Sequence, residues 1–446
     1  MKKFLTFNSV FFIGIGGVSM SALARFCIRQ NIAVLGSDKT ENQQVKALKF
    51  LGAKIKIGHK KDNLEDVDLV VYSSAISSDN PELIMAKEKN IPTLKRSELL
   101  NVIEKGFVNR VAISGCHGKT TVTAMCTHVF SKANKNPTSF IGGIDKVYSN
   151  FKYGSQDFLI YEACEYKKNM LDLNPTLSVV LNVDNDHMDS YASMHNLIES
   201  FSTFTSKRLS LINADDVNSQ SLWQTTSTTF GIKNQANYTA RYIRRGEKGY
   251  SFTFYKGQIK QGRINLQIAG LHNVYNALAT ASIADMYKLE FKHIKKGLEN
   301  FTGVNRRMEL VGNGNTKLYC DYAHHPKEIQ SSLLAFSEIS QQSIVVFQPH
   351  TYSRTKLLMC DFLSVLSGVK NLVIYKTYPA REKYDKRGSA KTLYDNLKSQ
   401  SNGKVYYSSS LATLTQTINF LIKENPKANV LFLGAGDIYE LAKKLK

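Results

Sequence analysis

Hydrophobic residues in this chain occur in short runs that alternate with longer segments of helical periodicity. Near the N-terminus, apolar runs at 10–13 and 32–35 flank a segment, 21–30, whose apolar residues recur at helical spacing. Further strand-like runs follow at 54–57 and 67–73. Buried strands that alternate with amphipathic helices are typical of a parallel sheet covered by helices. The pattern therefore predicts an α/β fold.

The same alternation recurs in the rest of the chain. It predicts strands in the centre, then a hairpin and more strands toward the C-terminus, at 111–113, 157–161, 177–181, 308–311 with 317–320, 344–347, 372–375 and 430–433. One helix is predicted over 355–366. A chain of 446 residues is too long for one hydrophobic core. We therefore expect three α/β domains, at 1–107, 108–304 and 305–446.

A glycine-bearing loop lies between a strand and a helix of the central domain. Its sequence is Ser114-Gly-Cys-His-Gly-Lys-Thr-Thr121. Such a loop aims backbone N–H groups and a positive helix dipole at one point, which suits a polyphosphate. Lys119 would reach the β- and γ-phosphates, and the Thr120 hydroxyl would bind Mg²⁺. Ile113 stands where the strict motif has glycine, so a tight turn with a surface lysine stays an alternative.

Acidic clusters follow two predicted strands of the same domain. Glu162-Ala-Cys-Glu165 follows the first, and Asn182-Val-Asp-Asn-Asp-His187 follows the second. Ligands gather at the carboxyl ends of parallel strands, so both clusters are expected near Lys119. Glu162 and His187 are therefore candidate metal ligands. Taken singly, an acid here could equally cap a helix, and a histidine could be a satisfied core residue.

The N-terminal domain carries a second glycine-rich loop, Gly14-Ile-Gly-Gly-Val-Ser-Met20, between a strand and a helix. The next strand ends at Gly36-Ser-Asp38. A glycine loop after one strand and an acid after the next are typical of a nucleotide-binding βαβ unit. Ser19 occupies the place of the last glycine of that motif, so nucleotide binding and simple close packing both stay open.

Charge and cysteine content narrow the class of protein. The net charge is +21, yet no basic run is interleaved with aromatic residues, which argues against a nucleic-acid partner. The electrostatic field of this positive charge suits small polyanions as ligands instead. The six cysteines form no CxxC pair, as expected of free thiols in the cytoplasm. No stretch of eighteen apolar residues occurs, so we expect no membrane span.

The order of motifs resembles that of the Mur ligases of bacterial cell-wall synthesis over nearly the whole chain. The segments that carry this resemblance are 14–24, 36–38, 115–121, 182–189, 270–279, 306–307, 321–326, 347–350, 352–355, 378–380 and 434–437. The resemblance implies a Rossmann-like UDP-sugar domain, a central phosphate-loop ATPase domain and a Rossmann-like C-terminal domain.

The resemblance also implies an activity. Within the family, the motifs are most similar to those of members that use ATP to join L-alanine to the lactyl carboxylate of UDP-N-acetylmuramate through an acyl phosphate, in peptidoglycan precursor synthesis. It implies Mg²⁺ as cofactor and ATP, UDP-N-acetylmuramate and L-alanine as substrates. It further implies no nucleic-acid partner, and a monomer or homodimer in the cytoplasm.

Residue roles follow from the same resemblance. The expected catalytic residues are Lys119, Glu162, His187 and Arg307. Those expected to bind ATP are Gly115, Cys116, His117, Gly118, Lys119, Thr120, Thr121, His272, Asn273, Asn276 and Asp321. The UDP-sugar would be bound by Gly14, Gly16, Gly17, Val18, Ser19, Met20, Ser37 and Asp38. His324 and Arg354 would bind the amino acid, and the metal ligands would be Thr120, Glu162 and His187.

The chain departs from the family pattern in places. Cys116 stands where the family usually has threonine, Cys164 and Tyr166 replace Asp and Ser, and Lys167-Lys168 replaces an Asp-Gly pair. Thr351 stands where the pattern has an arginine expected to meet the amino acid's carboxylate. A guanidinium grips a carboxylate through two hydrogen bonds and threonine offers one. From sequence alone, Thr351→Arg is therefore expected to lower the KM for L-alanine.

Other functions would explain parts of the sequence. Within the family, the alternatives are a recycling ligase that joins a whole tripeptide to UDP-N-acetylmuramate and a ligase with another acceptor amino acid. A dinucleotide-dependent oxidoreductase would explain the first βαβ unit but not Lys119 and Thr120. A basic nucleic-acid-binding NTPase would explain the net charge but lacks a track of basic and aromatic residues.

Overall fold

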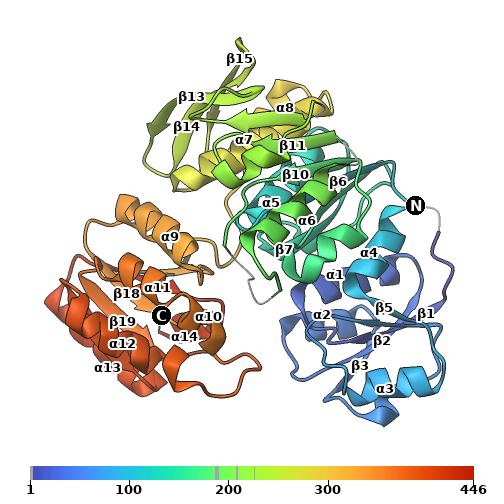
Figure 1. Ribbon diagram of the computed structural model, residues 1–446, viewed down its shortest axis with the longest axis horizontal. Coiled ribbons are helices and arrows are strands. Elements are labelled where there is room, and N and C mark those ends of the chain that lie inside the picture. The colour runs from blue at the N-terminus through green and yellow to red at the C-terminus, as the bar shows by residue number, and fades with distance from the viewer. Residues whose placement is uncertain (1–3, 186–189, 207–208, 226, 446) are drawn as a thin grey trace. The chain divides into compact units, whose positions relative to one another are not determined.

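The computed structural model describes residues 4–185, 190–206, 209–225 and 227–445. The chain divides into two compact units. One contains residues 1–245, 251–266 and 274–302, and the other contains 246–250, 267–273 and 303–446. The first unit holds two β-sheets and the second holds the third sheet (Figure 1).

The first sheet has the strand order β3-β2-β1-β4-β5, and all its neighbouring strands are parallel. Its strands are β1 (Ser9–Ile13), β2 (Ala33–Asp38), β3 (Lys54–Ile57), β4 (Leu69–Tyr72) and β5 (Thr93–Lys95). The helices are α1 (Val18–Arg29), α2 (Gln43–Phe50), η1 (Lys61–Asn63), α3 (Pro81–Glu88) and α4 (Arg96–Glu104).

Alternate residues of β1 explain why helices cover both faces of this sheet. Val10 and Phe12 pack in one hydrophobic cluster with residues of α1, α2 and α4. Phe11 and Ile13 pack in another, with residues of α3. Successive side chains of a strand point to opposite faces, so both faces of β1 are apolar and buried.

The second sheet has the order β15-β14-β13-β12-β11-β10-β6-β9-β7-β8. Its strands are β6 (Asn109–Ser114), β7 (Thr138–Asp145), β8 (Ser149–Lys152), β9 (Phe158–Glu162), β10 (Leu177–Val180), β11 (Leu209–Asn213), β12 (Ser227–Gly231), β13 (Tyr238–Arg245), β14 (Tyr250–Lys256) and β15 (Ile259–Asn265). The helices are α5 (Lys119–Lys132), η2 (Tyr166–Asp172), α6 (Met194–Thr205), η3 (Val217–Leu222), α7 (Leu271–Met286) and α8 (Phe291–Glu299).

The centre of this sheet positions the predicted phosphate loop. Strand β6 lies between β9 and β10 and is parallel to both. In this register Ile113 lies opposite Glu162, and Ser114 lies opposite Val180. The loop after β6 and the acidic segments after β9 and β10 therefore start at the same edge of the sheet, as the sequence predicts.

The third sheet has the order β16-β17-β21-β18-β19-β20. Its strands are β16 (Glu309–Asn313), β17 (Lys317–Asp321), β18 (Ser343–Phe347), β19 (Asn371–Tyr375), β20 (Lys404–Ser408) and β21 (Asn429–Leu433). The helices are α9 (Pro326–Ile339), α10 (Tyr352–Leu357), α11 (Met359–Leu366), η4 (Lys386–Gly388), α12 (Ala390–Gln400), α13 (Leu411–Glu424) and α14 (Ile438–Lys444).

The predicted hairpin is confirmed, because β16 and β17 are antiparallel. The rest of this sheet is parallel and carries helices on both faces. The helical segment predicted over 355–366 is confirmed, with one break. The structure has two helices there, which meet at Leu358, whose φ of −105° and ψ of 25° interrupt the regular helix. Among the described residues, no helix is long and apolar enough to cross a bilayer.

Candidate functional site

The loop between β6 and α5 depends on two glycines. Gly115 and Gly118 have φ angles of +129° and +89°, which favour glycine over other residues. A Cβ atom on Gly118 would lie 2.7 Å from Oδ1 of Asn276. Gly118 is also the N-cap of α5, so the N–H groups of the first turn, starting at Lys119, have no partners within the helix. The loop thus presents backbone donors and a positive helix terminus.

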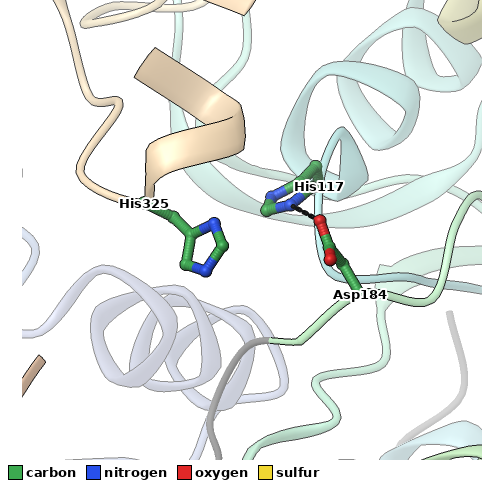
Figure 2. Close-up of side chains that lie close together, drawn as sticks. All are labelled: His117, Asp184 and His325. Carbon is green, nitrogen blue, oxygen red and sulfur yellow. Dashed lines mark hydrogen bonds and ion pairs between the residues drawn. The ribbon is translucent and has the colours of Figure 1, made fainter. Parts of the chain in front are cut away.

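The segment after β10 holds this loop from one side. Asn182 accepts a hydrogen bond from N–H of His117 at 2.8 Å and donates to the carbonyl of the same residue at 3.0 Å. Nε2 of His117 lies 3.2 Å from Oδ2 of Asp184, and Figure 2 shows the two side chains meeting. The N–H of Asp184 donates to the sulfur of Cys116 at 3.2 Å. Cysteine therefore fills the usual threonine position with a buried contact to the neighbouring segment.

The segment after β9 provides the ionic partner of Lys119. Nζ of Lys119 lies 3.0 and 2.9 Å from the two carboxylate oxygens of Glu165 and 2.5 Å from the carbonyl oxygen of Gly115. The Glu165 side chain is completely buried. Burial opposes the charge of Lys119, but the negative charge of Glu165 outweighs this and raises the pKa of Lys119. Lys119 is therefore held in its charged form at the N-terminus of α5.

Glu162, the predicted metal ligand, ends β9. Its Oε1 accepts the N–H of Gly142 at 2.5 Å. A Cβ atom on Gly142 would lie 2.5 Å from the same carboxylate, so this glycine makes room for Glu162. The Glu162 carboxylate and the Thr120 hydroxyl are oxygen donors of the kind that Mg²⁺ prefers, so the donor set fits this ion. His187, the third predicted ligand, lies outside the described residues.

The first turns of α7 carry the three residues expected on the adenine side, His272, Asn273 and Asn276. Nδ2 of Asn273 donates to the carbonyl of Ala269 at 2.6 Å. Asn276 lies against Gly118, as the contact described above shows. The structure thus brings Asn276 to the phosphate loop.

The glycine-rich loop of the first domain and Ser37-Asp38 lie together. The N–H of Gly14 donates to the carbonyl of Ser37 at 2.9 Å, and the N–H of Gly16 donates to Oδ2 of Asp38 at 2.8 Å. The Ser37 hydroxyl donates to Glu82 at 2.6 Å, and the ring of His59 lies 2.8 Å from the same carboxylate oxygen. Glu82 and His59 were not predicted as site residues because they lie in segments without a recognised motif. The remaining predicted residues of this loop, Gly17, Val18, Ser19 and Met20, form the start of α1.

In the third domain, Arg307 and Asp321 lie in one cluster at the end of the β16–β17 hairpin. Asp321 accepts the N–H groups of Met308 at 2.7 Å and Ala323 at 2.9 Å. Burial raises the pKa of Asp321, and the charge of Arg307 opposes this rise. The guanidinium of Arg307 lies over the ring of Tyr322, 5.2 Å from its centroid.

His324 and Arg354, the residues expected to bind the amino acid, both contact His350. The rings of His324 and His350 lie 5.7 Å apart, and Arg354 donates to the carbonyl of His350 at 2.9 Å. The His350 ring also stacks on Tyr378 at 5.5 Å. His325, the third side chain labelled in Figure 2, caps the N-terminus of α9 together with Glu328.

Thr351 has a partner that the sequence did not predict. Its hydroxyl donates to Oε1 of Glu382 at 2.5 Å, and the N–H of Ser353 donates to Oε2 of Glu382 at 2.8 Å. Burial tends to raise the pKa of Glu382, but these hydrogen bonds outweigh it and lower the pKa. The loop that begins α10 is therefore fixed by an ionised carboxylate.

Family comparisons match each of the three α/β regions. The Mur ligase family, catalytic domain matches residues 9–107, the Mur ligase middle domain matches 113–284, and the Mur ligase, glutamate ligase domain matches 306–436. A relative from Clostridium botulinum strain Langeland, a UDP-N-acetylmuramate–L-alanine ligase, is 40% identical over 97% of this chain and 96% of its own. The chain belongs to the Mur ligase family.

Other relatives and solved structures agree with this. An enzyme of the same printed name from Acetivibrio thermocellus is 39% identical over 98% of this chain and 95% of its own. The crystal structure of UDP-N-acetylmuramate-alanine ligase from Thermotoga maritima has a TM-score of 0.84 and 29% identity, and the match covers 98% of each chain. A murein peptide ligase from Psychrobacter arcticus, 19% identical with a TM-score of 0.73, shares the fold. The predicted three-domain α/β fold of this Mur ligase is confirmed.

Proposed function

We propose that this Mur ligase joins L-alanine to the lactyl carboxylate of UDP-N-acetylmuramate, with conversion of ATP to ADP and phosphate. The observation that carries this proposal is 40% identity to a ligase of that name over almost the full length of both chains. The Lys119 loop supports it independently, because its donors, charge and helix terminus suit a transferring phosphoryl group.

The residue roles form part of the proposal. The loop from Gly115 to Thr121, with Asn273, Asn276, His272 and Asp321, binds ATP. Residues 14–20 with Ser37 and Asp38 bind the UDP-sugar. Arg307 contacts the γ-phosphate, and His324 and Arg354 bind the carboxylate of L-alanine. We further propose domain boundaries near residues 107 and 304, action in the cytoplasm, and a monomer or homodimer.

The chemistry runs in two steps. A lactyl carboxylate oxygen attacks the γ-phosphorus, the bond from that phosphorus to the ADP oxygen breaks, and an acyl phosphate forms. The amine of L-alanine then attacks the acyl carbon and expels phosphate, which leaves an amide and releases a proton. Lys119 stabilises the charge on the transferring phosphoryl group. Mg²⁺, held by Thr120, Glu162 and His187, would neutralise the charge of the triphosphate.

Phosphate release tests this function directly. The purified protein is incubated with ATP, Mg²⁺, UDP-N-acetylmuramate and each amino acid of a panel, with the tripeptide of the recycling alternative included. We expect release to require both UDP-N-acetylmuramate and L-alanine. Phosphate release with UDP-N-acetylmuramate and the tripeptide, but with no single amino acid, would favour the recycling ligase. Phosphate release that needs no amine would overturn the ligase function.

A further inference from the structure

Lys119, the cation assigned to the phosphates, already contacts oxygen atoms of three residues. Its Nζ contacts both oxygens of Glu165, the carbonyl of Gly115 at 2.5 Å and the carbonyl of Cys116 at 3.3 Å. An ammonium group has three N–H donors. Lys119 must therefore give up at least one of these contacts to donate to a phosphate oxygen.

We propose that Glu165 is a positioning residue that competes with the triphosphate for Lys119 and thereby sets the nucleotide affinity. This inference rests on the proposed function, in which Lys119 binds ATP. The carboxylate provides the counter-charge that Lys119 needs whenever no phosphate contacts it, since a buried ammonium without a partner is strongly unfavourable. When ATP binds, Lys119 exchanges one anionic partner, the Glu165 carboxylate, for another, a phosphate oxygen.

Glu165 lies in a buried position on a backbone that is held by hydrogen bonds. Its side chain is fully buried. Its main-chain carbonyl accepts the hydroxyl of Tyr191 at 2.5 Å and the N–H of Lys168 at 2.9 Å. Because Glu165 is fully buried and Lys119 is a longer, partly exposed side chain, we expect the lysine to be the member of the pair that moves toward a phosphate.

Competition predicts that a change at Glu165 lowers the apparent Kd for the nucleotide. A change at a residue that only supports the site would raise this Kd. If only a fraction of molecules presents Lys119 to the phosphates, the apparent Kd equals the intrinsic Kd divided by that fraction. Glu165→Gln keeps the size of the side chain but removes its charge, so that fraction rises. A residue that merely supports the fold, or binds Mg²⁺, would weaken nucleotide binding when changed.

The test uses calorimetric titration of the full chain with AMP-PNP, a non-hydrolysable ATP analogue, and Mg²⁺. Glu165→Gln is expected to lower the Kd by roughly tenfold, and Glu165→Asp, which keeps the charge at a greater distance, by roughly threefold. The aspartate variant keeps the test possible if the glutamine variant does not fold. In turnover, the KM for ATP should fall while kcat stays within about threefold.

Glu104→Gln is the matched control. Glu104 is also a fully buried glutamate of the first unit, but its partners are Tyr161, Asn101 and Asn174. This variant should bind AMP-PNP like the parent. An unchanged or higher Kd in both Glu165 variants would overturn the proposal.

A Lys119→Met background shows whether Glu165 affects nucleotide binding through Lys119. In that background Glu165→Gln should change the Kd by less than about twofold, because no ammonium is left to compete for. The double variant carries neither charge of the pair, so it should fold. If Lys119→Met by itself left AMP-PNP affinity unchanged, the proposal for Glu165 would fail, whereas the proposed function would fail only if no phosphate were released with UDP-N-acetylmuramate and L-alanine.

Discussion

The phosphate loop of the central domain and the Thr351 loop of the third domain are held in different ways. The first is tied to strands on both sides, through Asn182 after β10 and the buried Glu165 after β9. The second follows a strand end, where His350 forms an isolated bridge with Tyr378, and its carboxylate partner Glu382 is only partly buried. Sheet register therefore positions the Lys119 loop, whereas side-chain hydrogen bonds hold the Thr351 loop.

The largest effect is expected from Lys119→Ala on the phosphate side. It removes a charge that acts most strongly on the transferring phosphoryl group, so kcat should fall by two orders of magnitude or more, about 3 kcal/mol. The midpoint of thermal unfolding should also fall, because the buried Glu165 carboxylate loses its ion pair with Lys119. Steady-state kinetics and thermal unfolding measure both. Lys49→Ala, which removes an exposed lysine paired with Glu41, is the control. Activity within threefold of the parent would contradict the role of Lys119.

Glu162→Gln is expected to have the next largest effect. Glutamine can still accept the N–H of Gly142, so the unfolding midpoint should change little. The loss of an anionic ligand should lower activity by about ten- to hundredfold and raise the Mg²⁺ concentration needed for half-maximal rate. His187→Ala should behave in the same way. A large loss of stability with normal Mg²⁺ dependence would instead mark Glu162 as a structural residue.

The contrast between the two loops explains what could be predicted from sequence. The strand ends around Lys119 were predictable, since a strand–loop–helix motif and parallel pairing bring Glu162, Glu165 and Asn182 to one edge. The identity of the acid that pairs with Lys119 was not predictable, because it depends on the backbone conformation after β9. The Thr351–Glu382 contact joins two loop residues 31 positions apart, with α10, α11 and β19 between them, and no periodic pattern in the sequence predicts such a pairing.

A change of pH should affect the third domain through His350. Burial and then the charges of His324 and Arg354 lower the pKa of His350 to about 4. In the unfolded chain histidine titrates near 6.5. Stability that is present above pH ~6.5 is therefore lost as the pH falls toward 4. Between pH 7 and 5 the parent should lose about 1–2 kcal/mol more than His350→Gln in urea unfolding. Parallel curves for parent and His350→Gln would refute the assignment.

The smallest effect is expected from Thr351→Arg, and the structure changes what sequence alone predicted. An arginine at this position would meet Glu382, which now accepts the threonine hydroxyl at 2.5 Å. The KM for L-alanine should therefore change by less than about threefold in the single variant. Adding Glu382→Gln should free the guanidinium and lower this KM by up to about tenfold. A tenfold decrease in the single variant would show that Glu382 does not restrain an arginine there.

In the proposed reaction, ATP activates the carboxylate of UDP-N-acetylmuramate before L-alanine attacks it. Substrate labelled with ¹⁸O in the lactyl carboxylate tests this most directly, with mass spectrometry of the released phosphate. The acyl-phosphate route transfers one carboxylate oxygen to phosphorus, so each phosphate released with L-alanine present should carry one ¹⁸O atom. Unlabelled phosphate, formed at the same rate as product, would contradict the account.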